Sequence, residues 1–202
     1  MSGGNRLVLT QCWRSDVRLF DFYSSLIVGG SRFTETLPVV LEAAKREFHF
    51  EGPARWNLVI SHRKRVQLNA LLNLSLKPLE GALYIPVKRK RPGSLAQSMW
   101  IWPGIQLLGC VCEKKGVRNQ VLYTVEELTT NCCKLSGGIS LTHEQVSEWT
   151  VLSFAQTYAS CQGTEFEGTL RLHDITHKFF TKRHLFVGLS RAKSSASVDL
   201  KE

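Results

Sequence analysis

The sequence is poor in the features that mark secreted, membrane or metal-binding proteins. Its six cysteines include no CxxC pair and no regular spacing, which excludes the usual zinc-finger pattern and a disulfide scaffold. No run of about 18 uncharged apolar residues is present, so no transmembrane helix is expected. Met1–Gln11 has polar residues where a signal peptide needs an apolar core. We therefore expect a soluble, intracellular protein with reduced thiols, no disulfides and no membrane contact.

A pair of histidines has metal-ligand spacing, but the residues around it do not complete a site. His173 and His177 stand four positions apart, so a helix would place them on one face. No cysteine or carboxylate stands at matching spacing beside them. The sequence predicts two solvent-facing histidines and no metal site.

Acidic residues are scarce relative to basic ones. The chain of 202 residues has 26 Lys and Arg against 17 Asp and Glu, a formal net charge of +9. Such an excess fits a polyanionic partner such as nucleic acid. The hydrophobic content of 43% is sufficient for a buried core in one domain or two small ones.

The order of apolar segments predicts an α/β protein. Helices are expected over 16–28, 36–48 and 64–74, and a strand over 58–61, which leads directly into the third helix. Ser15 is a suitable N-cap for the first helix, and Pro38 lies at the start of the second. The apolar side of the third helix is predicted to consist of Val66, Ala70, Leu71 and Leu74.

Residues 81–148 differ from the segments around them. Short apolar runs separated by Pro, Gly and charged turns predict a small β-rich insert. After it, strands are expected over 151–155, 169–173 and 195–200, and a helix over 183–192. Strands and helices thus alternate outside the insert, as in a parallel sheet with helices on its faces.

The segment Leu9–Ser15, LTQCWRS, resembles the LxxNYRS segment of UvrD-like superfamily 1 helicases. The resemblance implies that Arg14 reaches the γ-phosphate of a bound nucleotide, because a guanidinium fork matches phosphate oxygens. Taken alone, the segment is better explained by a surface arginine one residue before a helix N-cap.

The segment Thr157–Phe166, TYASCQGTEF, resembles the fifth motif of the same superfamily. That motif reads TxHxxKGLEF in UvrD-like proteins and TxHKSQGxT in RecD-like or petite-integration-frequency-type proteins. Ala159 replaces the histidine of both patterns, so any task of that histidine is in doubt. The resemblance implies that Thr157 contacts the nucleic-acid backbone and that Glu165 contacts the ribose. It implies nucleotide binding by Gln162, Gly163 and Glu165. A turn capped by polar side chains is the alternative.

The segment Arg183–Ala192, RHLFVGLSRA, resembles the sixth motif, VGVTRA or VALSRA, and is the most specific of the matches. It implies that Arg191 is an arginine finger, a cation placed where charge grows on the transferred phosphoryl group. An ordinary helix that ends in arginine would explain the spacing but not the whole string.

A fourth segment, Leu58–Asn69, resembles the strand and helix start that contact the nucleic-acid backbone in RecD-like enzymes. The implied contacts are Ser61, His62 and Arg63, which follow the predicted strand at its carboxyl end. Lys64 and Arg65 are equally well explained as solvated charges on a helix.

Two strings of the insert, WIWPGIQLLG and RNQVLY, resemble strands of the small SH3-like barrel of RecD-like helicases. Trp100 and Trp102 alternate along the first string, which more often places one of them in the core. At most one of them is expected to stack on bases, with Trp100 as the candidate. The basic run Lys88–Arg91 stays open among a phosphate-binding patch, a nuclear import signal and a solvated loop.

The resemblance extends from Leu7 to Leu200 and implies a RecA-like parallel sheet with flanking helices, interrupted by a small SH3-like insert. The implied parts are the beginning of a second RecA-like motor domain over 1–80, the insert over 81–148, and the rest of the domain over 149–202. No GxxxxGK[ST] loop and no Asp-Glu pair occurs, so ATP with Mg²⁺ would be held mainly by a domain outside this chain. A fragment, a truncated gene model or a subunit that uses a partner's domain would each fit.

Two functions of different classes follow. The first is the C-terminal motor half of an ATP-dependent helicase that moves on single-stranded DNA or RNA together with an N-terminal RecA-like domain, in cis or in trans. Its direction of movement stays open. The second is a non-catalytic nucleic-acid-binding module derived from a helicase, and a structural adaptor is a third. Both arginines favour the first, because a binding module needs no γ-phosphate contact.

Overall fold

The computed structural model describes residues 14–87 and 97–202, which form two compact units. The terminal unit comprises residues 14–58 and 162–202, and the central unit comprises Val59–Cys161. Most of the LTQCWRS string and the whole basic run Lys88–Arg91 lie outside the described residues.

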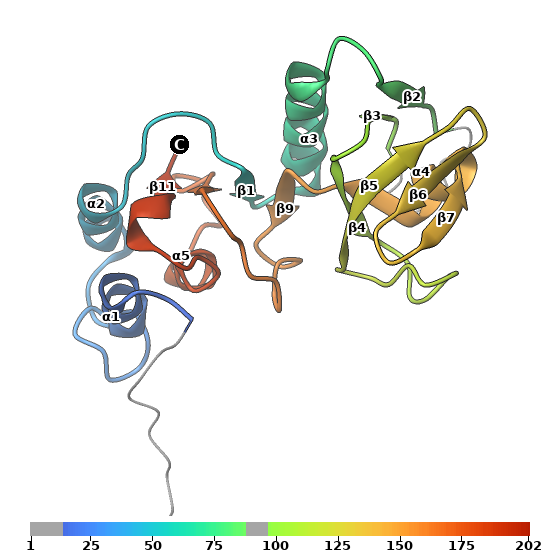
Figure 1. The fold of residues 1–202 in the computed structure, drawn as a ribbon. Coiled ribbons are helices and arrows are strands. Elements are labelled where there is room, and N and C mark those ends of the chain that lie inside the picture. The colour runs from blue at the N-terminus through green and yellow to red at the C-terminus, as the bar shows by residue number, and fades with distance from the viewer. Residues whose placement is uncertain (1–13, 88–96) are drawn as a thin grey trace, which may run out of the picture. The chain divides into compact units, whose positions relative to one another are not determined.

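The terminal unit contains parallel strands with helices beside them (Figure 1). Its strands are β1 (Trp56–Val59), whose last residue belongs to the central unit, β10 (Leu170–Leu172) and β11 (Val198–Leu200). The middle strand, β10, pairs in parallel with β1 on one side and with β11 on the other. Burial of the apolar side chains of all three strands is typical of a parallel sheet covered by helices.

Three helices flank these strands: α1 (Val17–Ser25), α2 (Leu37–Glu47) and α5 (Lys182–Leu189). Aromatic contacts join them. The rings of Tyr23 on α1 and Phe186 on α5 meet edge to face at 5.6 Å, and those of Phe22 and Phe48 do so at 4.9 Å. The first two predicted helices are confirmed, and Pro38 lies in the first turn of α2 as expected.

The N-cap of α1 is Asp16, so the assignment of Ser15 was wrong by one residue. The Asp16 Oδ1 atom accepts a hydrogen bond of 2.8 Å from the Leu19 N–H, and Oδ2 accepts one of 2.6 Å from the Ser195 N–H. Ser15 is buried instead, and its hydroxyl donates to the Ala192 carbonyl at 3.2 Å. Burial raises the pKa of Asp16, but these N–H donors outweigh it and hold the pKa below its ordinary value. Ser15 and Asp16 therefore connect the start of α1 to residues 192–195 through hydrogen bonds.

The interpretation of the two histidines was wrong for His173. This residue follows β10 and is buried, with Nε2 at 2.9 Å from Asn57 Oδ1, and residues 173–177 form turns rather than a helix. A spacing of four residues places two side chains on one face only within a helix. In the part of the chain that the structure describes, no cluster of three His, Cys, Asp or Glu side chains could hold a metal ion.

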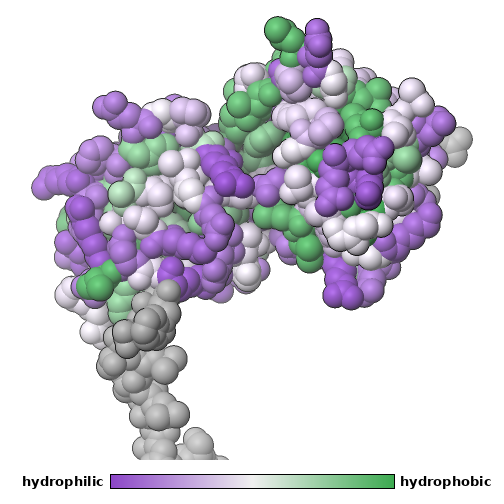
Figure 2. All heavy atoms as spheres, viewed as in Figure 1, coloured by the Kyte–Doolittle hydropathy of each residue, from purple (hydrophilic) through white to green (hydrophobic). Residues whose placement is uncertain are grey.

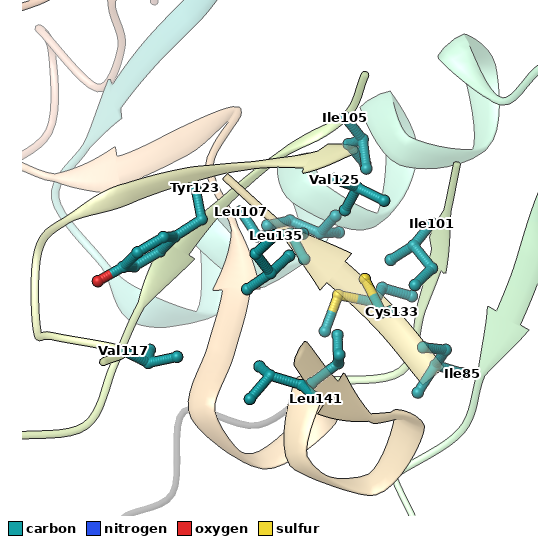
Figure 3. Close-up of a cluster of buried hydrophobic side chains, with 13 residues drawn as sticks. Ile85, Ile101, Ile105, Leu107, Val117, Tyr123, Val125, Cys133, Leu135 and Leu141 are labelled. Carbon is teal, nitrogen blue, oxygen red and sulfur yellow. The ribbon is translucent and has the colours of Figure 1, made fainter. Parts of the chain in front are cut away.

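The central unit is built around an antiparallel sheet with the order β7-β6-β5-β4-β8. These strands are β4 (Gln106–Gly109), β5 (Leu122–Leu128), β6 (Cys132–Leu135), β7 (Ile139–Thr142) and β8 (Thr150–Leu152). A separate hairpin pairs β2 (Leu83–Ile85) with β3 (Met99–Ile101). Apolar side chains from both sheets fill one core, including Ile85, Leu107 and Leu135 (Figure 3). This part is the predicted β-rich insert.

Two features of the central unit differ from the prediction. A helix, α4 (His143–Trp149), was missed, although its capping box of Thr142 and Gln145 follows a known sequence signature. The strand predicted over 151–155 is two strands, β8 and β9 (Ala155–Thr157), because Ser153 and Phe154 interrupt it. The first of these pairs with β4 in the antiparallel sheet.

Helix α3 (His62–Leu76) buries a polar face, so the predicted apolar face was wrong. Its buried residues are Arg65, Asn69 and Asn73, whereas Leu71 and Leu74 are 64% and 62% exposed. Figure 2 shows hydrophobic side chains at the surface in the region of α3. The Asn69 amide explains the inversion, since it donates to the carbonyls of Leu152 and Ala155 and accepts from the Ala155 N–H. Because Asn69 bonds these backbone groups of β8 and β9, α3 packs with its polar face inward and leaves Leu71 and Leu74 exposed.

None of the helices within the described ranges is long and apolar enough to span a membrane. The described cysteines Cys110, Cys112, Cys132, Cys133 and Cys161 are free thiols. Burial raises the pKa of both Cys110 and Cys133 to about 11, so these two thiols remain protonated at neutral pH.

Candidate functional site

Three segments that are far apart in the sequence meet in the terminal unit: residues 14–16, 164–167 and 191–195. Hydrogen bonds connect every pair of them. Arg14 Nη2 donates to the Thr164 carbonyl at 3.4 Å, the Ser15 hydroxyl donates to Ala192, and the Phe166 N–H donates to the Arg191 carbonyl at 3.0 Å. The resemblance had assigned these segments to one nucleotide site, and the fold brings them together.

Arg14 is held by an ion pair at this junction. Its Nε atom lies 3.1 Å from Glu165 Oε1, and the two side chains are 32% and 49% exposed. The guanidinium therefore stays accessible to solvent beside a carboxylate. An anionic ligand with several oxygens could compete with a single carboxylate for the guanidinium fork.

Phe166 anchors the fifth-motif segment. It is 1% exposed, forms a parallel bridge with Ala192 and lies with its ring 5.3 Å from the ring of Trp56. Because side chains alternate along an extended segment, burial of Phe166 turns Glu165 and Glu167 outward. The two glutamates accordingly reach Arg14 and Lys193, respectively.

The ion pair of Glu167 and Lys193 was not predicted. The hydrogen bond from Lys193 and its charge lower the pKa of Glu167, and the same interactions raise the pKa of Lys193. Lys193 lies two residues after Arg191, outside the string that carries the motif resemblance. Lys193 and Glu167 are 26 residues apart, so the spacing of residues within a single motif could not predict this ion pair.

Arg191 lies just beyond the end of α5, so the predicted helix over 183–192 is too long. The helix stops at Leu189, with Ser190 as its C-cap, and the Ser190 hydroxyl donates to the Val187 carbonyl at 3.1 Å. The Arg191 N–H donates to the Gly188 carbonyl at 3.1 Å in this tight end turn. Arg191 is half-buried and belongs to the same junction as Arg14.

Gln162 and Gly163 lie in an exposed turn that precedes the buried Phe166. Gly163 has a φ of 92°, in the left-handed region that favours glycine. In the described part of the chain, no heavy atom lies within 4 Å of the position that a Cβ atom would take. The backbone at Gly163 is therefore open to close approach by a ligand.

The predicted nucleic-acid contacts all lie in the central unit, the first of them at the end of β9. Thr157 is 3% exposed, and its hydroxyl donates to the Ser160 hydroxyl at 2.9 Å. The Ser160 N–H in turn donates to Thr157 Oγ1 at 3.2 Å. Thr157 thus stabilises the turn in which Ala159 stands exposed.

Ser61, His62 and Arg63 form the start of α3, directly after β1. The Ser61 hydroxyl accepts from the Lys64 N–H at 3.1 Å, while the side chains of His62 and Arg63 are exposed. The first N–H groups of a helix lack intrahelical partners and carry a partial positive charge. A basic first turn on a 15-residue helix favours an anionic group such as phosphate.

Trp100 lies on β3 and is half-buried. Its backbone N–H and carbonyl both bond the Asn73 side chain at 2.8 Å. Lys77 Nζ lies 4.5 Å from the ring centroid, and the ring of Tyr84 lies at 5.2 Å. Tyr84 and Lys77 were not singled out from the sequence. They make Trp100 part of a basic and aromatic cluster.

No protein-family model and no curated protein matches the sequence. Solved structures do match. The Pif1 helicase of Bacteroides bound to single-stranded DNA is 14% identical, with a TM-score of 0.64, and the match covers 94% of this chain. A complex of that helicase with ADP-AlF3 and single-stranded DNA is 17% identical, with a TM-score of 0.62 and 95% coverage. Pif1 helicase from Candida albicans is 13% identical, with a TM-score of 0.60 and 95% coverage.

The chain has the fold of about half of a Pif1 helicase. It spans about half the length of these Pif1 structures, which it covers by 50%, 51% and 55%. The predicted fold class, a RecA-like parallel sheet with flanking helices, is confirmed by this match and by the strands of the terminal unit. At these identities the Pif1 likeness describes the fold.

Proposed function

We propose that this chain is the C-terminal motor half of an ATP-dependent superfamily 1 DNA helicase. The observation that carries the proposal is the junction of residues 14–16, 164–167 and 191–195. It joins two arginines and an exposed glycine turn from three distant parts of the sequence.

The two arginines of the junction fit the phosphate oxygens of ATP. When bound, Mg-ATP supplies the γ-phosphoryl group that water attacks, and the first motor domain would supply most of its ligands. Arg14 would exchange Glu165 for phosphate oxygens, since a doubly charged oxygen cluster attracts a guanidinium more strongly than one carboxylate. Arg191 would stabilise the charge that develops during transfer. Gln162 and Gly163 would border the nucleotide, and Glu165, once released, would face the ribose.

The residues of the central unit fit single-stranded DNA. The exposed first turn of α3, with Ser61, His62 and Arg63, would hold a backbone phosphate. The half-buried Trp100 would stack on a base, with Lys77 providing a positive charge beside it. A direct contact of Thr157 with the strand stays a prediction. The Bacteroides Pif1 complex with single-stranded DNA supports this part of the proposal through the shared fold.

An ATPase complementation experiment tests the proposal. ATP hydrolysis is measured for this chain alone, for a Pif1-type first motor domain alone, and for the two joined in one polypeptide, each with and without single-stranded DNA. We expect turnover only in the joined protein, and we expect DNA to stimulate it. A joined protein that is folded and binds DNA but shows no hydrolysis would refute the motor proposal and support the non-catalytic binding module.

A further inference from the structure

The hairpin strand β2 borders a groove in the central unit. The groove has a volume of about 650 Å³ and lies between β2 and α4. Its strand side consists of the consecutive residues Leu83–Val87, and its helix side includes His143, Glu144, Ser147 and Glu148. Because both inward-facing and outward-facing residues of β2 line the groove, the edge of the strand faces it.

The backbone N–H and carbonyl groups of Tyr84 point away from β3, towards the edge of β2 that faces the groove. Tyr84 pairs with Trp100 in the hairpin, and both backbone polar groups of Trp100 bond Asn73 instead of β2. The pair is therefore a non-hydrogen-bonded position of the antiparallel ladder, where the N–H and carbonyl of both residues point outward. Within residues 14–87 and 97–202, β2 pairs only with β3, so the N–H and carbonyl of Tyr84 remain available to an added strand.

The helix side of the groove is acidic. Glu144 and Glu148 are exposed and stand four residues apart on α4, which places both on one side of the helix. No basic side chain of the described ranges forms an ion pair with either carboxylate. Two carboxylates that have no ion-pair partner among the described residues, on one wall of the groove, favour a cationic ligand and disfavour nucleic acid.

We propose that this groove binds an extended basic peptide of a partner protein, which adds as a strand to β2. The peptide backbone bonds the N–H and carbonyl of Tyr84, as in other cases of strand addition. Residues four apart on a helix are separated by about 6 Å along its axis. Alternate residues of a strand are separated by about 6.7 Å. The two carboxylates therefore match lysines or arginines at every second position of the peptide.

Fluorescence anisotropy with the whole chain tests the charge requirement. The probe is a short labelled peptide of alternating lysine and valine, and the matched probe has glutamate in place of lysine. We expect binding of the lysine peptide only. The double substitution Glu144→Lys and Glu148→Lys should weaken that binding by about tenfold or more, because it sets like charges against each other. The double substitution Glu126→Lys and Glu127→Lys, at exposed sites on β5 outside the groove, makes the same change in net charge and should leave the binding unchanged.

Two substitutions of Tyr84 test the strand edge. Tyr84→Pro removes the outward N–H together with the ring, while the ladder bonds to β3 come from the neighbouring residues, and proline is tolerated on such an edge. We expect it to weaken peptide binding by about three- to tenfold, the effect of one lost hydrogen bond. Tyr84→Ala removes the ring but keeps the N–H, and it should bind the peptide like the unsubstituted chain.

Either of two results would overturn the proposal. One is equal binding of the lysine and glutamate peptides, which would show that the acidic wall has no role. The other is loss of binding with Tyr84→Ala as large as with Tyr84→Pro, which would replace the strand edge with a ring contact. Unchanged binding of the lysine peptide by the charge-reversed chain would lead to the same conclusion as the first result, that the acidic wall has no role. The charge-reversal test decides the matter even if the proline variant does not fold.

Discussion

The ion pair of Arg14 and Glu165 contributes little to folding, since side chains that are 32% and 49% exposed are well screened by water. Its importance lies in keeping a guanidinium at the junction of the three motif segments. Substitution of Arg14 should therefore impair the proposed function while it changes the stability of the fold very little.

Arg14→Ala in the joined motor should lower the ATPase rate by about a hundredfold or more, because the proposed charge contact to the transferred phosphoryl group would be lost. The same substitution should change the free energy of unfolding by less than about 1 kcal/mol. The measurements are steady-state ATP hydrolysis and urea unfolding.

The matched control is Arg18→Ala, which removes another arginine of the terminal unit from an exposed ion pair, with Glu47 at 2.9 Å. It should leave the ATPase rate unchanged. An equal loss of rate in both variants would argue that Arg14 has no special place at the nucleotide.

Three strings that the sequence assigned to one nucleotide site lie together in the fold, and the roles of their residues stay predictions. Arg14, Glu165 and Arg191 were assigned to one site from three separate motifs, and their segments meet in the structure. Lys193 was missed because its partner, Glu167, lies in another segment, and only the fold brings the two together. His173 was misinterpreted because its spacing from His177 has meaning only in a helix.

At the scale of elements, Asp16 joins the start of α1 to the segment around Ser195. Its folded pKa lies below the ordinary value of 3.8, so its stabilising effect is complete above that value and is lost as the pH falls through the folded pKa. Asp16→Ala should cost about 1 kcal/mol at neutral pH through loss of the cap.

Asp16→Asn tests the contribution of the negative charge apart from that of the helix cap. Asparagine caps a helix about as well as aspartate does, but its side chain does not titrate. Thermal or urea unfolding between pH 7 and pH 2 gives the comparison. The stability difference between the unsubstituted chain and Asp16→Asn should be largest at neutral pH and should vanish in acid. A difference that does not vary with pH would contradict the assigned role of the carboxylate.

Helix α3 provides a second prediction at this scale. Asn69 is fully buried and makes three hydrogen bonds to backbone groups of Leu152 and Ala155. Asn69→Ala should cost about 2–4 kcal/mol, since it leaves buried polar groups without partners. Leu71→Ala, on the exposed face, should change stability by less than about 0.5 kcal/mol. Comparable losses in the two variants, measured by urea unfolding, would refute the polar interface.

Periodic apolar segments predicted most helices and strands of the terminal unit, because local propensity and burial agree there. The prediction failed where tertiary hydrogen bonds decide the outcome. On α3 the leucines gave a misleading apolar face, since the free backbone groups of β8 and β9 select Asn69. The break between β8 and β9 and the short α4 depend on packing within the insert, and only the capping box of α4 was visible in advance.

At the scale of the whole molecule, the charge of +9 predicts salt-dependent binding of single-stranded DNA. Affinity measured by anisotropy should fall steeply with salt. Arg63→Ala, which removes a proposed phosphate contact at the start of α3, should weaken binding at every salt concentration and reduce the slope by about one ion.

Arg46→Ala serves as the control, because it makes the same change in net charge at an exposed site on α2 in the terminal unit. Its slope should equal that of the unsubstituted chain. Identical slopes for Arg63→Ala and Arg46→Ala would show that net charge alone, rather than the start of α3, determines binding.

The fold class was predictable because alternating strands and helices around a β-rich insert admit few arrangements. The division into two units was not visible in the sequence, since it falls within β1, between Leu58 and Val59, and between Cys161 and Gln162. The likeness to Pif1 structures at 13–17% identity shows that this arrangement persists where little of the sequence does.

The most direct test of the central claim is the single-turnover rate of ATP hydrolysis in the joined motor with Arg191→Ala. We predict a loss of about a thousandfold or more, the effect of removing an arginine finger, with single-stranded DNA binding retained. Arg183→Ala, at the opposite end of α5, should leave the rate within about twofold, because no phosphate contact is proposed for it. An Arg191→Ala motor that hydrolyses ATP as fast as the Arg183→Ala motor would contradict the assignment of this chain as a motor half.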